Sequence, residues 1–126
     1  MRILLADHRT RVRFALRTLL ARQPGLEIVG EARGVEDLIV QVAVTQPDLV
    51  LFDWDPGVEA VAHIPRVLRR ICPGLVIIAL SGRPEARHAA LAAGADAFVS
   101  KVDPPERLLS AVLPVGQDAI EEPALV

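Results

Sequence analysis

Short apolar runs of this chain end abruptly in polar side chains at four places. The side chains that follow the runs are those of Asp7 and His8, of Asp53 and Asp55, of Ser81, and of Lys101. Such runs are typical of strands buried in a parallel sheet, whose carboxyl ends meet at one edge, so we expect these side chains to lie close together. Carboxylates at close quarters repel one another and need a cation. Mg²⁺ suits hard oxygen ligands, and the Lys101 ammonium can neutralise further charge.

This set of side chains suits phosphoryl transfer. A carboxylate held by a metal ion and a lysine can act as a nucleophile toward a phosphoryl group, and a nearby hydroxyl can bind the transferred oxygens. A hydrolase built on Ser81, His8 and an aspartate is a weaker alternative, because the chain lacks Gly-x-Ser-x-Gly and an evident oxyanion loop. No Gly-x-Gly-x-x-Gly or P-loop motif follows the first apolar run, which argues against dinucleotide and P-loop nucleotide binding.

Strands and helices that alternate along the chain must position these side chains. Apolar runs predict strands at residues 2–6, 26–30, 49–53, 75–80 and 96–100. Helical spacing and Pro or Gly boundaries predict helices at residues 10–22, 35–46, 65–72, 84–94 and 104–113. Residues 54–64 are predicted to be irregular, and Trp54 is expected to line a contact surface. Because parallel strands need helical crossovers, the pattern predicts an α/β fold with a doubly wound, five-stranded parallel sheet.

Length and composition limit the class of protein. The chain has 126 residues, which suits a single domain, and 52% of them are hydrophobic, which excludes disorder. No apolar stretch approaches the ~20 residues of a membrane span and no signal peptide opens the chain, so we predict a cytoplasmic location without membrane contact. The net charge of −2 gives no reason to expect direct nucleic-acid binding. Arg9, Arg13 and Arg17 share one face of the first helix, which we interpret as solvated.

Four motifs of the chain are similar to those of one protein family. They are Ile3-Leu-Leu-Ala-Asp7, Pro47-Asp-Leu-Val-Leu-Phe-Asp53, Leu80-Ser-Gly82 and Ala93-Gly-Ala-Asp-Ala-Phe-Val-Ser-Lys101. Through these motifs, residues 2 to about 113 resemble the receiver domain of response regulators in two-component signalling. The resemblance implies a flavodoxin-like (βα)5 fold with strand order 2-1-3-4-5. We predict a receiver domain at residues 1–113, followed by a flexible C-terminal tail at 114–126 that contains proline, glycine and an acidic pair.

The resemblance also implies roles for individual side chains in phosphoryl transfer. Asp53 is the implied phosphoacceptor, Lys101 is the ammonium that pairs with the phosphoryl group, and Ser81 is the switch hydroxyl. Phe98 falls at the aromatic switch position of the last strand, a half-buried position in this fold where core packing is the alternative role. Signal output is implied to come from the face formed by the last two predicted helices and the strand between them.

The cofactor implied by the resemblance is Mg²⁺, with Asp7, Asp53 and the backbone carbonyl of Asp55 as ligands. The family has an acidic pair after the first strand, whereas His8 replaces the second acid here. Loss of one negative charge and one hard ligand predicts weaker Mg²⁺ binding. His8 has three alternative roles: a histidine that only pairs with a carboxylate, part of a modified metal site, or a proton-sensitive switch.

The resulting hypothesis is a receiver, not an enzyme, that takes a phosphoryl group onto Asp53 from a sensor histidine kinase or a phosphotransfer protein and then binds a downstream protein partner. The alternative is a degenerate receiver that acts through protein contacts without phosphorylation. His8 favours this alternative, and tight Mg²⁺ binding would count against it. The sequence leaves open the identity of the kinase, the output, the formation of a homodimer, and whether an effector domain belongs to the same protein.

Overall fold

The computed structural model describes residues 1–55 and 61–121, with side chains up to residue 113. At its centre is a five-stranded parallel sheet with the order β2-β1-β3-β4-β5, which confirms the predicted order. The strands are β1 (Arg2–Ala6), β2 (Glu27–Ala32), β3 (Leu49–Asp53), β4 (Val76–Ser81) and β5 (Ala97–Ser100). The helices are α1 (Thr10–Ala21), α2 (Val35–Thr45), α4 (Ile64–Ile71), α5 (Arg87–Ala92) and α6 (Pro105–Glu121), with a 3₁₀ turn, η1 (Pro84–Ala86), before α5.

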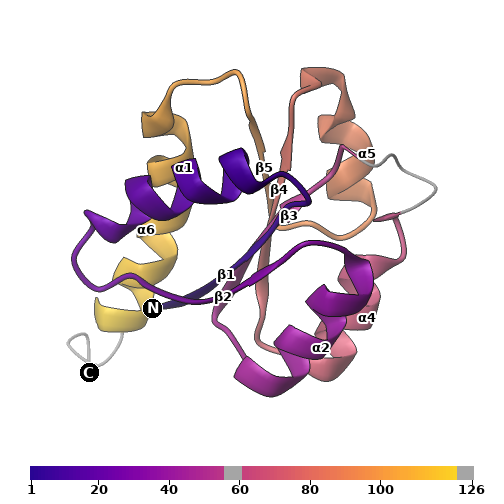
Figure 1. Ribbon diagram of the computed structural model, residues 1–126, viewed down its shortest axis with the longest axis horizontal. Coiled ribbons are helices and arrows are strands. Elements are labelled where there is room, and N and C mark those ends of the chain that lie inside the picture. Colours follow the sequence, from indigo (N-terminus) through magenta and orange to yellow (C-terminus); the bar gives the residue numbers. More distant parts are fainter. Residues whose placement is uncertain (56–60, 122–126) are drawn as a thin grey trace.

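Helices cover both faces of the sheet. α1 and α6 lie on one face, and α2, α4 and α5 lie on the other (Figure 1). Alternate residues of a strand point to opposite faces, so the domain has two cores. On β3, Leu49 and Leu51 join the core beneath α1 and α6, whereas Val50 and Phe52 join the core beneath α2, α4 and α5. No helix in the described part of the chain is both long enough and apolar enough to cross a membrane.

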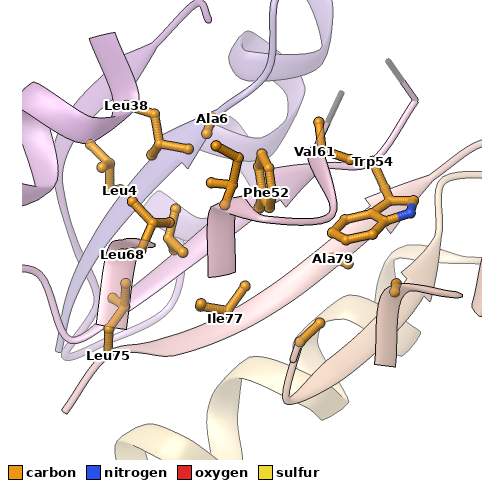
Figure 2. Close-up of a cluster of buried hydrophobic side chains, with 14 of the residues drawn as sticks. Leu4, Ala6, Leu38, Phe52, Trp54, Val61, Leu68, Leu75, Ile77 and Ala79 are labelled. Carbon is orange, nitrogen blue, oxygen red and sulfur yellow. The ribbon is translucent and has the colours of Figure 1, made fainter. Parts of the chain in front are cut away.

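Trp54 lies in the larger core, and the expectation that it lines a contact surface is wrong. Its side chain is fully buried and meets the Phe52 ring edge to face, with the ring centroids 5.7 Å apart (Figure 2). The reason is the strand period of two, which directs Phe52 and Trp54 to the same face. The Trp54 amide donates a hydrogen bond to the Leu80 carbonyl at 2.7 Å, so the pairing with β4 continues past the end of β3.

Several element boundaries differ from the predicted ones. β2 runs from Glu27 to Ala32 rather than over the predicted residues 26–30, and it pairs only with β1, with a register shift between Ile3 and Leu4. α6 continues to Glu121, past the predicted helix end at Leu113. A proline such as Pro114 removes one helical hydrogen bond, which raises the cost of continuing the helix without forbidding it. Of the stretch 54–64 predicted as irregular, residues 56–60 lie outside the described part.

The helix ends follow the backbone preferences of single residues. α4 has Pro65 in its first turn, where the missing N–H costs nothing. Gly94 adopts φ +115° just after α5, a conformation that favours glycine, and this ends the helix as predicted. The first turn of the predicted 84–94 helix is instead the 3₁₀ turn η1.

The solvated face predicted for α1 is wrong at Arg13. Its guanidinium is buried and donates to the Asp7 backbone carbonyl at 2.7 Å and to the Glu31 carboxylate at 3.1 Å. Arg17 donates to the other oxygen of the same carboxylate. Burial opposes ionisation of Glu31, but its hydrogen bonds and ion pairs with Arg17 and Arg13 outweigh this and lower the pKa of the Glu31 carboxyl. The two arginines thus tie α1 to β2 beneath the loop that carries Asp7.

Candidate functional site

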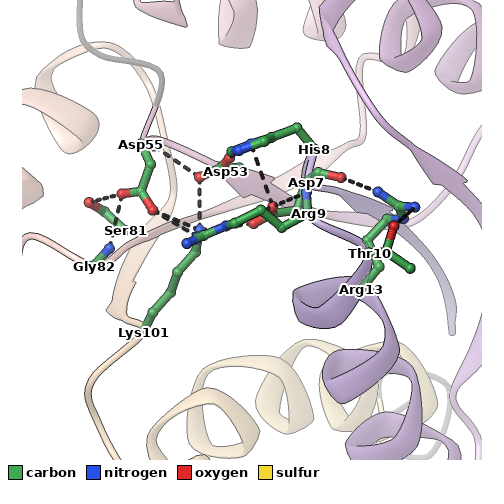
Figure 3. A network of polar contacts seen from close by, with 10 residues as sticks. All are labelled: Asp7, His8, Arg9, Thr10, Arg13, Asp53, Asp55, Ser81, Gly82 and Lys101. Atoms are coloured by element: carbon green, nitrogen blue, oxygen red, sulfur yellow. Dashed lines mark hydrogen bonds and ion pairs between the residues drawn. The ribbon is translucent and has the colours of Figure 1, made fainter.

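The carboxyl edge of the sheet brings the predicted site residues together. β3 and β4 are in register up to the pair Asp53 and Leu80, and β4 and β5 up to the pair Ser81 and Ser100. Pairing continues one residue further, because the Asp7 amide donates to the Ala32 carbonyl at 3.1 Å and the Lys101 amide donates to the Ser81 carbonyl at 2.7 Å. The ends of the strands therefore determine the backbone positions of the site residues (Figure 3).

Lys101 is the central cation of the site. Its Nζ lies 2.8 Å from Asp7 Oδ2, 2.9 Å from Asp53 Oδ1 and 2.9 Å from Asp55 Oδ2. Burial alone would lower the pKa of the Lys101 ammonium, but hydrogen bonds to the three carboxylates outweigh it and raise that pKa. The lysine is therefore charged throughout the physiological range and holds the three acids in one cluster.

Asp55 turns its carboxylate into the site. Oδ1 accepts hydrogen bonds from the Ser81 hydroxyl at 2.7 Å and from the Gly82 amide at 3.0 Å, and Oδ2 accepts from Lys101. Burial would raise the pKa of the Asp55 carboxyl, but hydrogen bonds from Lys101, Ser81 and Gly82 outweigh it and lower the pKa to about 2. The sequence predicts this side chain among the polar groups at the sheet edge, but the family resemblance implies a role only for its backbone carbonyl.

Two further side chains border the acids from the loop after β1. His8 Nδ1 lies 3.1 Å from Asp53 Oδ2, and the imidazole is 59% exposed. Arg9 donates to Asp55 Oδ2 at 3.0 Å, and its backbone amide donates to Asp7 Oδ1 at 2.8 Å. Sequence reasoning missed Arg9, since helical periodicity grouped it with a solvated face. Three carboxylates thus face two permanent cations, which leaves the site with a net negative charge when His8 is neutral.

The donor set at this edge suits a divalent cation in part. Asp7, His8 and Asp53 each offer a ligand atom, and these atoms lie within 4.8 Å of one another in the described part of the chain. The two aspartates are buried and supply the hard oxygens that Mg²⁺ prefers. The His8 nitrogen is a softer ligand, which suits transition metals better than Mg²⁺.

Phe98 is buried in the core rather than half-buried as predicted, with only 7% of its surface exposed. The Arg87 guanidinium lies 5.9 Å from the centre of the Phe98 ring and covers it from α5. Phe98 packs in the core beneath α2, α4 and α5, and the long Arg87 side chain adds to its burial by shielding the ring. His63 and His88 are exposed.

Comparisons with known proteins confirm the family that the sequence motifs predict. The family model for the response regulator receiver domain matches residues 3–113. The transcriptional regulatory protein YhcZ of Bacillus subtilis is 38% identical over 113 residues, covering 86% of this chain and 52% of the relative. The nitrate/nitrite response regulator NarL of Escherichia coli is 31% identical over 112 residues, with 87% and 52% covered. This chain therefore spans about half the length of these curated relatives.

A solved structure gives the same assignment. A LuxR-family two-component response regulator from Aurantimonas superimposes with a TM-score of 0.77 at 30% identity, over 92% of this chain and 84% of that chain. From the match of the family model to nearly the whole chain, supported by these relatives, the chain belongs to the response regulator receiver domain family.

Proposed function

We propose that this chain accepts a phosphoryl group on Asp53 from a phosphohistidine of a sensor kinase or phosphotransfer protein, and that this changes a face that binds a downstream protein. The observation that carries the proposal is the position of Lys101, whose Nζ is 2.9 Å from Asp53 while the Ser81 hydroxyl is directed into the same site. A buried carboxylate, a fixed ammonium and a hydroxyl donor are the groups that phosphoryl transfer needs.

The transfer itself is a displacement at phosphorus. A carboxylate oxygen of Asp53 forms a bond to phosphorus while the P–N bond of the donor phosphohistidine breaks. The electron pair of that bond stays with the imidazole nitrogen, which takes up a proton from solvent. Lys101 keeps its proton and neutralises charge on the transferred group. The Ser81 hydroxyl and the Gly82 amide, which donate to Asp55 in this structure, would donate to phosphoryl oxygens.

Mg²⁺ is the cofactor proposed for this step. When bound, it supplies positive charge to the attacking and transferred oxygens. Asp7 and Asp53 would hold it, since they are the buried carboxylates of the ligand set. His8, which stands where the family has an acid, lowers the negative charge of the set, and we infer weaker binding for that reason.

A beryllofluoride titration tests the proposed phosphoacceptor. Trp54 is buried directly after Asp53 and serves as the fluorescence reporter. With Mg²⁺ present, beryllofluoride should change the Trp54 signal of the wild type in a saturable manner, and Asp53→Asn should abolish this change. Glu27→Gln, at the opposite end of the sheet, is the matched control and should behave as the wild type. An equal response in Asp53→Asn would contradict the proposal.

The His8→Asp variant should bind Mg²⁺ more tightly than the wild type. Two unit charges ~4 Å apart near a protein surface interact by about 4 kcal/mol. Because the His8 side chain is 59% exposed, we reduce this to roughly 1.4 kcal/mol, or about tenfold in Kd. Mg²⁺ titration of Trp54 fluorescence measures the difference. An unchanged Mg²⁺ affinity would show that His8 does not limit the metal site.

One observation favours a second candidate, a degenerate receiver that signals by protein contacts alone. His8 is hydrogen-bonded to Asp53, and Arg9 and Lys101 already neutralise much of the acidic cluster. If this candidate is correct, the Trp54 fluorescence of the wild type should not change with Mg²⁺ or beryllofluoride. The His8→Asp variant should then respond to both.

A further inference from the structure

Three hydrogen-bond donors of the site contact the Asp55 carboxylate, two at Oδ1 and one at Oδ2, and Lys101 is shared with Asp53. They are the Ser81 hydroxyl from the end of β4, the Gly82 amide next to it, and the Lys101 ammonium after β5. If Asp53 carried a phosphoryl group, these donors would be the ones available to its oxygens. In this structure they are directed at the Asp55 carboxylate (Figure 3).

We propose that the Asp55 carboxylate is a built-in occupant of the phosphoryl-oxygen site, which holds Ser81, Gly82 and Lys101 before transfer and must leave for transfer to occur. The inference rests on the proposed function, because that function supplies the competing anion. It assigns the Asp55 side chain a part in regulating the site, in addition to the backbone role expected from the sequence.

The contacts of Asp55 are those of a bound anion rather than of a turn residue. Oδ1 accepts from Ser81 at 2.7 Å and from Gly82 at 3.0 Å, and Oδ2 accepts from Lys101 at 2.9 Å and from Arg9 at 3.0 Å. Each oxygen thus has two donors, and two of the four donors are cations. The side chain is 22% exposed, so protein groups have replaced most of the water that would solvate an acid in a surface turn.

Asp53 and Asp55 compete for the same cation. The Lys101 Nζ lies 2.9 Å from an oxygen of each carboxylate, and the Asp55 amide donates to Asp53 Oδ1 at 2.9 Å. A phosphoryl group on Asp53 would bring its negatively charged oxygens to this ammonium. There they would lie next to the Asp55 carboxylate, and the like charges of the two anions would repel each other. The Asp55 carboxylate therefore opposes phosphorylation until its side chain rotates out of the site. Arg9, whose side chain is exposed, loses its hydrogen bond to Asp55 in that rotation.

Beryllofluoride affinity tests the competition. In the presence of Mg²⁺, Asp55→Ala should bind beryllofluoride about tenfold more tightly than the wild type. Asp55→Asn, which keeps one acceptor oxygen but not the charge, should change the affinity in the same direction by less, and it provides the test if the alanine variant does not fold. Glu27→Gln loses one negative charge at the far end of the sheet and should leave the affinity unchanged.

Hydrogen exchange of the Gly82 amide tests the occupancy without any phosphoryl mimic. In the wild type this amide is bonded to Asp55 Oδ1, so its exchange should be slow, and Asp55→Ala should speed it by about tenfold or more. Unchanged Gly82 exchange together with unchanged beryllofluoride affinity in both Asp55 variants would overturn the inference. Faster Gly82 exchange in Asp55→Ala, with no beryllofluoride response in any variant, would support the occupant and overturn the proposed phosphorylation instead.

Discussion

Replacing Lys101 with methionine should lower the free energy of unfolding by about 3 kcal/mol near neutral pH, because it leaves buried carboxylates without their shared cation. The side chains of Asp7 and Asp53 are 2% and 5% exposed, so water cannot take over the role of the ammonium. Methionine preserves much of the volume of lysine, which separates the loss of charge from the loss of packing. Urea unfolding followed by circular dichroism measures the difference between the two proteins.

The loss in Lys101→Met should depend on pH. The folded-state pKa of Asp55 is depressed from 3.8 to about 2, so this acid contributes stability above its unfolded pKa and loses it as the pH falls toward about 2. The stability difference between wild type and Lys101→Met should therefore shrink over that interval. Arg66→Met removes an exposed arginine of α4 and should cost little at any pH. An equally small cost for Lys101→Met near neutral pH would contradict the central role of this ammonium.

Replacing Trp54 with alanine should cost about 4 kcal/mol of stability, the largest effect expected from a single core position. The side chain is fully buried beside Phe52, and its removal leaves a cavity between the sheet and the helices of that face. Thermal and urea unfolding both measure this loss.

A comparison with Trp54→Phe separates packing from polarity. The Trp54 Nε1 atom has no hydrogen-bond partner among the described residues, so the phenylalanine ring gives up volume but also removes a buried polar group. Trp54→Phe should therefore retain most of the stability that Trp54→Ala loses. A cost below about 1 kcal/mol for the alanine variant would be out of range for a buried tryptophan and would place the side chain at the surface.

The sequence predicts the sheet well because its strands are buried on both faces. Continuous apolar runs such as Leu49–Phe52 are typical of strands that helices cover on both sides, and the helical pattern between the runs indicates parallel pairing. β2 is the exception, since its sequence is mixed and most of its side chains are only half-buried. The extension of α6 to Glu121 was also missed, because proline and glycine raise the cost of a helix without setting its end.

The parallel topology explains why the site could be predicted in outline. Asp7 and Lys101 are 94 residues apart, yet both follow strands whose ends share one edge. The contacts of Asp55, Arg9 and Arg13 could not be predicted in the same way. They depend on side-chain directions and on partners in other elements, and no period in the sequence records that Asp55 faces Ser81 or that Arg13 reaches under the loop to the Asp7 carbonyl.

The most direct test of the central claim is covalent phosphorylation of the chain by a small donor. The protein is incubated with phosphoramidate and Mg²⁺, and intact-mass spectrometry follows the gain of phosphoryl groups by the wild type and by Asp53→Asn. We predict that the wild type gains one phosphoryl group and that Asp53→Asn gains none. Equal labelling of the two proteins, or a wild type that stays unmodified while His8→Asp and Asp55→Ala also stay unmodified, would contradict the assignment of Asp53 as the phosphoacceptor.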